Sequence, residues 1–248
     1  MSPQSRLVVV HPDAQILAEA AASRLLTRIL DLQSVRSPVH VVLTGGTVGI
    51  KTLAAVATNR VRDAVDWTGV HLWWGDERYL PVGDADRNET QAREALLDHL
   101  DVLPAENVRA MPSVVDDVAV DAAAALYADE LARFAPDGAA APVFDITLLG
   151  MGPDAHVASL FPGHPGGTVT GQSTVGVRNS PKPPPERVSL TFETIQASHE
   201  VWIIAAGAEK ADAVKAGLAG ADKAEAPVAA AVGAQLTLWL LDSAAAGR

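Results

Sequence analysis

The chain has 248 residues, a formal net charge of −11 at pH 7 and no cysteine, and 48% of its residues are hydrophobic. This length and apolar content allow one α/β domain with a substantial core, which we expect to span residues 1–248. The missing cysteines exclude disulfides, thiolate metal sites and a cysteine nucleophile. The negative charge argues against nucleic acid as a partner, since nucleic acid is bound by basic surfaces.

No apolar run is long enough to span a membrane, and residues 1–6 lack the apolar segment of a signal peptide. The sequence therefore predicts a cytoplasmic protein that does not bind a membrane. Lysine and arginine together number only 19, so an anionic small molecule would need cations gathered at one place. The sequence leaves the oligomeric state open, a monomer included.

Short apolar runs alternate with helical patterns along the chain. The runs that we predict to be strands are Leu7–Val10, Val39–Leu43, Val70–Trp74, Phe144–Leu149, Val188–Phe192, Val201–Ala205 and Leu236–Leu241. The helical patterns cover Asp13–Leu32, with Asp13 as the cap, Thr47–Ala57, Asn88–Leu100, Asp117–Phe134 and Glu209–Leu218. The strands are continuously apolar, as in a sheet that is covered on both faces. We predict an α/β fold: a doubly wound, mostly parallel sheet with helices on both faces, in a single domain.

Gly45, Gly46 and Thr47 stand between a predicted strand and a predicted helix. Free backbone N–H groups and the helix dipole at such a junction suit a phosphate. The segment is not a P-loop, because no Gly-Lys-Ser/Thr follows, and it is not the Gly-x-Gly-x-x-Gly of dinucleotide-binding proteins. Taken alone, it is equally compatible with a plain turn.

A charged segment, Asp76-Glu77-Arg78, follows the predicted strand Val70–Trp74. A solvated loop is one interpretation. The other is a binding site, because the planar guanidinium of Arg78 matches a carboxylate, a phosphate or a developing oxyanion.

The most informative segment follows the run Phe144–Leu149, where a Gly-x-Gly turn leads into Asp154 and His156. The carboxyl end of a strand is where an open α/β sheet binds its ligand. Imidazole titrates near neutral pH, so His156 is a candidate general base, although a lone histidine can also be a hydrogen-bonded core group. Asp154 could fix the tautomer of His156 or shape the turn.

Two other chemistries have little support. A zinc site of Asp154, His156 and His164 would match no strong metal-ligand spacing. Ser159 lacks the Gly-x-Ser-x-Gly elbow of a serine hydrolase. We therefore expect neither a metal nor another cofactor.

The segment Leu149–Pro162 resembles the signature of the 6-phosphogluconolactonases, usually Leu-Gly-x-Gly-x-Asp-Gly-His-x-Ala-Ser-Leu-Phe-Pro. Four further matches follow the family's order along the chain. They are the Gly-Gly loop in Leu43–Thr47, the Gly-Asp-Glu-Arg motif Gly75–Arg78 with Asn88, the segment Ser180–Arg187, and Gly207 with Lys210.

This resemblance implies metal-independent hydrolysis of 6-phospho-D-glucono-1,5-lactone to 6-phosphogluconate, a step of the oxidative pentose phosphate pathway. The partner would be this phosphorylated sugar lactone. His156 would be the general base, Arg78 would contact the substrate and Asp76 would orient it. The other residues expected to bind substrate or phosphate are Gly45, Gly46, Thr47, Asn88, Lys182, Arg187 and Lys210.

The chain departs from the family pattern at three places. Thr47-Val48-Gly49 replaces Ser-Thr-Pro, and Arg87 replaces a serine, where it would either add a cation or face solvent. Ala155 replaces a glycine. Because alanine favours helix and follows Pro153, we expect helical dihedrals at Ala155 and His156 at a helix N-terminus, where the dipole favours neutral imidazole.

Two alternative functions stay open. A glucosamine-6-phosphate deaminase-like isomerase would resemble this chain, but its relay needs a glutamate where this chain has Phe161. A non-catalytic sugar-phosphate-binding module would keep the phosphate loop and lose the base, whereas His156 is present here.

Overall fold

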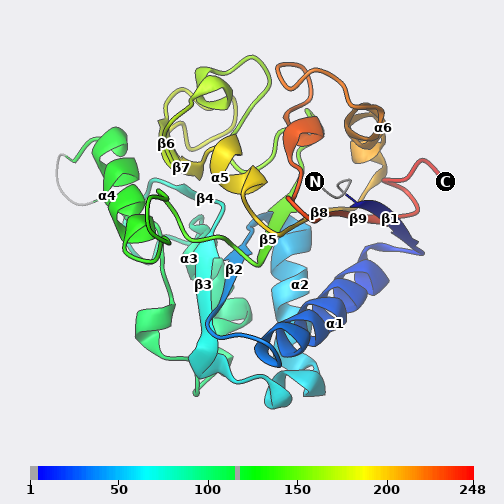
Figure 1. The fold of residues 1–248 in the computed structure, drawn as a ribbon. Helices are drawn as coiled ribbons and strands as arrows, with labels where there is room; N and C mark the ends of the chain where they lie inside the picture. Colours follow the sequence, from blue (N-terminus) through cyan, green and yellow to red (C-terminus); the bar gives the residue numbers. More distant parts are fainter. Residues whose placement is uncertain (1–4, 115–117) are drawn as a thin grey trace.

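The computed structural model describes residues 5–114 and 118–248, so the predicted helix start at Asp117 and the first four residues lie outside the described part (Figure 1). Six strands form one sheet in the order β1-β9-β8-β5-β2-β3, and all five pairings are parallel. These strands are β1 (Ser5–His11), β2 (Val39–Leu43), β3 (Val70–Trp74), β5 (Ile146–Gly150), β8 (Glu200–Ala205) and β9 (Leu236–Asp242). A second, antiparallel sheet has the order β4 (Asp76–Arg78), β7 (Arg187–Leu190) and β6 (Thr174–Val177).

Helices cover both faces of the six-stranded sheet. In Figure 1, α1 and α2 lie on one face, and α5 and α6 lie on the other. The helices are α1 (Ala14–Gln33), α2 (Gly46–Thr58), α3 (Asn88–Ala95), α4 (Val120–Ala132), α5 (Phe192–Gln196) and α6 (Ala211–Ala219). The predicted doubly wound α/β fold in a single domain is therefore confirmed, as is the Asp13 cap, whose carboxylate accepts from the N–H groups of Gln15 and Ile16.

The core follows from the apolar strands. Their side chains, packed between the two helical layers, include four fully buried tryptophans, Trp73, Trp74, Trp202 and Trp239. Because both faces are covered, alternation of polar and apolar residues is absent from the central strands. No helix in the described ranges is long and apolar enough to cross a lipid bilayer.

Three predicted elements differ from the structure. The run Val188–Phe192 is predicted as a strand of the mostly parallel sheet, but only residues 188–190 are a strand. They belong to β7, which pairs antiparallel with β4 and β6, and Phe192 begins α5. An apolar run alone does not specify its partner strand. The helix expected over 88–100 ends at Ala95, because Leu96 leaves the helical region (φ −144°), and a 3₁₀ turn covers Leu97–His99. The helix expected from Glu209 begins as a 3₁₀ turn, Ala208–Lys210.

The strand order reverses between β2 and β5. From β2 the chain continues outward to β3, whereas from β5 it continues to β8 on the other side. A crevice therefore forms at the carboxyl ends of β2 and β5, where an open α/β sheet binds ligands. The two strand ends are tied together by a hydrogen bond from the Gly150 N–H to Thr44 Oγ1 at 3.0 Å.

Candidate active site

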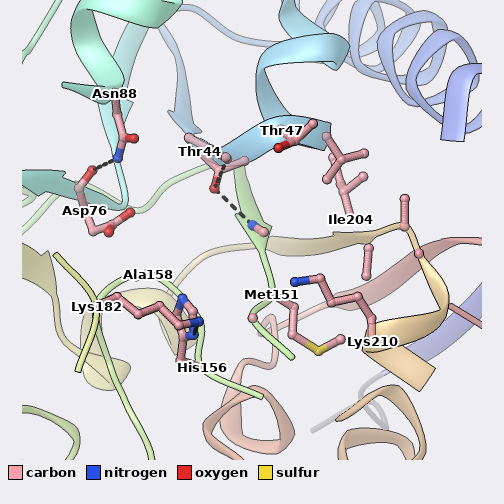
Figure 2. Close-up of a pocket in the computed structure, with 18 of the residues that line it drawn as sticks. Thr44, Thr47, Asp76, Asn88, Met151, His156, Ala158, Lys182, Ile204 and Lys210 are labelled. Carbon is pink, nitrogen blue, oxygen red and sulfur yellow. Dashed lines mark hydrogen bonds between the residues drawn. The ribbon is translucent and has the colours of Figure 1, made fainter. Parts of the chain in front are cut away.

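A pocket of about 560 Å³ opens at this crevice (Figure 2). The structure brings almost all of the predicted site residues into its wall. The predicted residues that line it are Gly45, Gly46, Thr47, Asp76, Arg78, Asn88, His156, Lys182, Arg187 and Lys210. Asp154 stands behind His156 rather than in the wall. Lys51, Glu209 and Asp242 also line the pocket, although their sequence context did not mark them as site residues.

One end of the pocket is the N-terminus of α2. Gly45 is the cap residue and makes no side-chain cap bond, and Gly46 has a positive φ of +78°. The first N–H groups of α2 therefore have no side-chain acceptor, an arrangement that suits an anion. Lys210 reaches toward the pocket below Thr47 in Figure 2. Burial lowers the pKa of Lys210, while Glu209 opposes this effect.

Lys51 adds a further cation at this end. It is exposed and lies four residues after Thr47 on α2, which places the two on the same helix face. That spacing was the signal that could have identified Lys51 from the sequence.

A buried carboxylate, Glu77, holds the segment that carries Arg78 and Asn88. Its Oε1 accepts from the backbone N–H groups of Arg78 and Asn88, each at 2.7 Å, and its Oε2 accepts from the Glu89 N–H at 2.8 Å. Burial raises the pKa of Glu77 to about 6, against the opposing effects of Arg87 and of these three N–H groups. Glu77 thus joins β4 to the start of α3 and fixes two residues of the pocket wall.

Arg87 neither faces solvent nor adds a cation to the pocket. Its side chain is 1% exposed, and its Nη2 lies 3.2 Å from Glu89 Oε2 and 3.7 Å from Glu77 Oε2. The same atom donates to the carbonyl of Met111 at 2.9 Å. Arg87, which stands where the family has a serine, therefore places a positive charge beside the buried carboxylate of Glu77.

Asp76 is held from two sides. Ser159 Oγ donates to Asp76 Oδ2 at 2.7 Å, and Arg187 Nη1 lies 4.0 Å from the same oxygen. Ser159 is fully buried, so its hydroxyl positions Asp76, in agreement with the rejection of a serine nucleophile. The backbone carbonyl of Asp76 accepts from Asn88 Nδ2 at 2.8 Å (Figure 2).

Most side-chain hydrogen bonds of Arg187 go to backbone carbonyls of residues 181–185, the proline-rich loop. Its Nη2 donates to the carbonyl of Pro183 at 2.8 Å, and its Nε donates to that of Pro184 at 3.2 Å. Burial lowers the pKa of Arg187, which Asp76 counteracts. These bonds give Arg187 a structural task beside the pocket in addition to any contact with a ligand.

His156, Asp154 and Lys182 form a tight cluster. His156 Nδ1 lies 2.5 Å from Asp154 Oδ1, and Lys182 Nζ lies 3.1 Å from each of these two atoms. Burial alone would raise the pKa of Asp154, but His156 and Lys182 outweigh it and hold that pKa well below its usual range. The ionised carboxylate can only accept a hydrogen bond, so Nδ1 carries a proton and the Nδ1–H group donates a hydrogen bond to Asp154. This tautomer leaves the lone pair of His156 on Nε2.

The expected backbone at Ala155 is wrong. Ala155 has φ +64° and Ala158 has φ +47°, and the segment after Pro153 forms turns rather than a helix. The Gly152 N–H donates to the carbonyl of His156, and the Val228 N–H donates to the carbonyl of Ala155. These bonds fold the segment into a tight loop and outweigh the helix propensity of alanine. His156 is therefore not at the N-terminus of a helix, contrary to the expectation for this segment.

The three residues considered for zinc do not converge. His164 Nε2 contacts the carbonyl of Arg178 at 2.8 Å, and its Nδ1 accepts from the Gly166 N–H at 3.1 Å. Both ring nitrogens of His164 are thus engaged away from Asp154 and His156. Within the described ranges, no group of three or more histidine, aspartate or glutamate side chains is arranged to hold a metal ion.

Residues 12–239 match the family model of glucosamine-6-phosphate isomerases/6-phosphogluconolactonase. The chain belongs to this family. It is 54% identical over 245 residues to the 6-phosphogluconolactonase of Streptomyces coelicolor, covering 97% of this chain and 94% of that one. It is 47% identical over 246 residues to the 6-phosphogluconolactonase of Mycobacterium leprae, covering 98% of both.

A solved structure shares the fold along nearly the whole chain. The structure of 6-phosphogluconolactonase from Trypanosoma brucei superposes with a TM-score of 0.86 at 28% identity, covering 98% of both chains. The family resemblance inferred from the five motifs is thus confirmed.

Proposed function

We propose that this family member is a lactone hydrolase that converts 6-phospho-D-glucono-1,5-lactone into 6-phosphogluconate in the oxidative pentose phosphate pathway. Its similarity to proteins named 6-phosphogluconolactonase supports this activity. The observation that carries the proposal is the Asp154–His156 pair, in which Asp154 engages Nδ1 of a pocket-lining imidazole, so that in neutral His156 the lone pair is on Nε2. A cytoplasmic location and a monomeric state remain predictions.

In the proposed reaction, a water molecule attacks the lactone carbonyl carbon while His156 Nε2 takes one of its protons. The carbonyl oxygen becomes an oxyanion, for which Arg78 is the candidate partner in the pocket wall. The tetrahedral intermediate then collapses, the bond from the carbonyl carbon to the ring oxygen breaks, and the imidazolium returns the proton to that oxygen. The new carboxylic acid loses its proton to solvent.

The phosphate of the substrate fits the end of the pocket at α2. The N–H groups that follow Gly45 have no side-chain cap, and Thr47 and Lys210 stand beside them. We assign the phosphate to this end, and we assign Arg187 mainly to holding the proline-rich loop and Asp76.

The two alternative functions fit the site less well. A deaminase relay needs a carboxylate five residues after His156, where the buried ring of Phe161 packs 4.6 Å from the imidazole, centroid to centroid. A binding module without catalysis has no need for the Asp154–His156 pair that this chain retains.

The test is hydrolysis of freshly prepared 6-phospho-D-glucono-1,5-lactone, followed with a pH indicator and with a chelator present. We expect turnover that the chelator does not reduce. His156→Gln should lower kcat by about 10²- to 10⁴-fold, the usual contribution of a general base. Near-normal kcat in this variant would contradict the role of His156, and inactivation by the chelator would contradict metal independence.

The same protein preparation distinguishes the alternatives. Release of ammonia from glucosamine 6-phosphate would favour the deaminase. Binding of 6-phosphogluconate without turnover of either substrate would favour the binding module.

A further inference from the structure

Lys182 projects from a loop that holds its backbone firmly. Ser180 Oγ donates to the Lys182 carbonyl at 2.8 Å and accepts from the Lys182 N–H at 3.2 Å. Arg187 Nη2 donates to the same carbonyl at 3.3 Å. Three hydrogen bonds therefore hold the backbone from which this side chain extends.

The ammonium group of Lys182 is aimed at the base and its partner. Nζ lies 3.1 Å from Asp154 Oδ1 and 3.1 Å from His156 Nδ1, and Figure 2 shows Lys182 extending to His156. Two donors, the ammonium and the Nδ1–H, therefore share one carboxylate oxygen. Lys210, in contrast, approaches from below Thr47 in that view.

We propose that Lys182 is a positioning residue for the base rather than a phosphate ligand: by sharing Asp154 with the imidazole, it keeps His156 neutral and its Nε2 free to take a proton. This inference rests on the proposed function and names a further residue that the reaction needs.

Two opposite charges lie beside the imidazole of His156, the carboxylate of Asp154 and the ammonium group of Lys182. A carboxylate in contact with an imidazole favours the imidazolium form, which cannot act as a base. A second positive charge 3.1 Å from Nδ1 disfavours that form, so Lys182 offsets the effect of Asp154. The pair can then orient the imidazole through Nδ1 without protonating Nε2.

Among the cations of the described residues, only Lys182 lies within hydrogen-bond distance of the Asp154–His156 pair. One face of the imidazole packs against the apolar ring of Phe161. The other charged groups that share the pocket with His156 are Asp76, Arg78, Arg187, Lys51, Lys210, Glu209 and Asp242. Among the described residues, the side chain of His156 has its hydrogen-bonded ion pair with Asp154, and the ammonium group of Lys182 lies beside the same ring nitrogen.

The experiment compares Lys182→Met with Lys182→Arg by NMR titration of the imidazole resonance of His156, assigned with His156→Gln. We expect the midpoint of the His156 titration to rise by about one pH unit or more in Lys182→Met, the size of shift that a nearby charge produces. Lys182→Arg keeps the charge and should move the midpoint by less than half as much. Lys210→Met is the matched control: it removes a pocket lysine that forms no hydrogen bond or ion pair with Asp154 or His156 in the described part of the chain, so it should move the midpoint by less than half as much as Lys182→Met.

Kinetics give the second readout. In Lys182→Met, the acidic limb of the pH profile of kcat/KM should move to higher pH by the same amount as the NMR titration. The change in KM should be equal for the phosphorylated lactone and for unphosphorylated gluconolactone. An unmoved titration, or a KM increase confined to the phosphorylated lactone, would overturn the proposal and make Lys182 a phosphate ligand.

The titration also separates this inference from the proposed function. If the wild-type protein hydrolysed no lactone, the proposed function would fail. The NMR midpoints of the Lys182 variants would still show whether Lys182 controls the protonation of His156.

Discussion

Gly152 lies so close to the imidazole of His156 that a β-carbon on residue 152 would come within 2.0 Å of Nδ1. The same β-carbon would lie 2.2 Å from Asp154 Oδ1. The second glycine of the Gly-x-Gly turn therefore provides the space in which the Asp154–His156 pair forms.

Gly152→Ala should accordingly displace the Asp154–His156 pair. We expect a loss in kcat of about 10²-fold or more, approaching the loss of the base itself. The measurement is kcat on the phosphorylated lactone, with circular dichroism to verify that the fold is kept. Gly167→Ala is the matched control, since its β-carbon would meet only a Phe192 ring atom at 3.8 Å. Full activity in Gly152→Ala would show that the pair does not depend on this space.

The positive φ of Ala155 predicts how the substitution Ala155→Gly changes the stability of the protein. Replacing Ala155 by glycine removes the strain of an L-residue in the left-handed region, which stabilises the folded state by about 1–2 kcal/mol. Glycine costs about 0.5–1 kcal/mol in chain entropy, and the lost buried methyl costs about 0.8 kcal/mol. Ala155→Gly should therefore change the free energy of unfolding by no more than about 1 kcal/mol, measured by urea denaturation.

The control for this prediction is Ala124→Gly. Ala124 is buried to the same extent, 4% exposed, but lies within α4. Helix propensity and the lost methyl act in the same direction there, so we expect a loss of about 2 kcal/mol. Equal losses in the two variants would contradict the left-handed conformation of Ala155.

The sequence predicted the pocket well where the signal was local. The run Val39–Leu43 is β2, and residues 146–149 of the run Phe144–Leu149 lie in β5. The glycines near the ends of these two strands mark the crevice where the strand order reverses. Glycine is required at Gly46 by a positive φ of +78° and at Gly152 by the close approach of the His156 imidazole.

The other features of the fold and the site depended on contacts between segments that are far apart in the sequence. The conformation of Ala155 is set partly by the Val228 N–H, which is 73 positions away, and no local pattern indicates such a bond. The partner strands of Arg187–Leu190 and the burial of Arg87 beside Glu77 are likewise properties of the assembled fold. The charge pattern of Asp76-Glu77-Arg78 therefore indicated a site without showing that its middle residue points inward.

Lys210 gives a prediction about substrate discrimination. If it binds the phosphate beside α2, Lys210→Met removes a charge-assisted hydrogen bond of about 1.5–3 kcal/mol. We expect KM for the phosphorylated lactone to rise about tenfold to a hundredfold, with kcat changed much less. Unphosphorylated gluconolactone is the control substrate, and its KM should stay nearly constant. Equal increases for both lactones would show that Lys210 has a structural role.

Glu77 links the buried support of the site to pH. Its pKa is raised from 4.5 to about 6 by burial, so between these values the folded state binds more protons than the unfolded state. The free energy of unfolding must then fall as the pH rises through this window. The shift corresponds to about 2 kcal/mol. Glutamine at position 77 cannot titrate, so the variant lacks this dependence.

We therefore expect Glu77→Gln to gain about 2 kcal/mol relative to the wild type between pH 4.5 and pH 7. The measurement is the free energy of unfolding in urea at several pH values, with Glu225→Gln, at an exposed position, as the control. The variant can be less stable than the wild type at every pH, because its amide group faces backbone N–H donors. The test is the change in the difference with pH. If the wild type instead gained stability relative to Glu77→Gln as the pH rises, the folded-state pKa of Glu77 would be lowered. The three N–H groups of Arg78, Asn88 and Glu89 would then outweigh burial in setting that pKa.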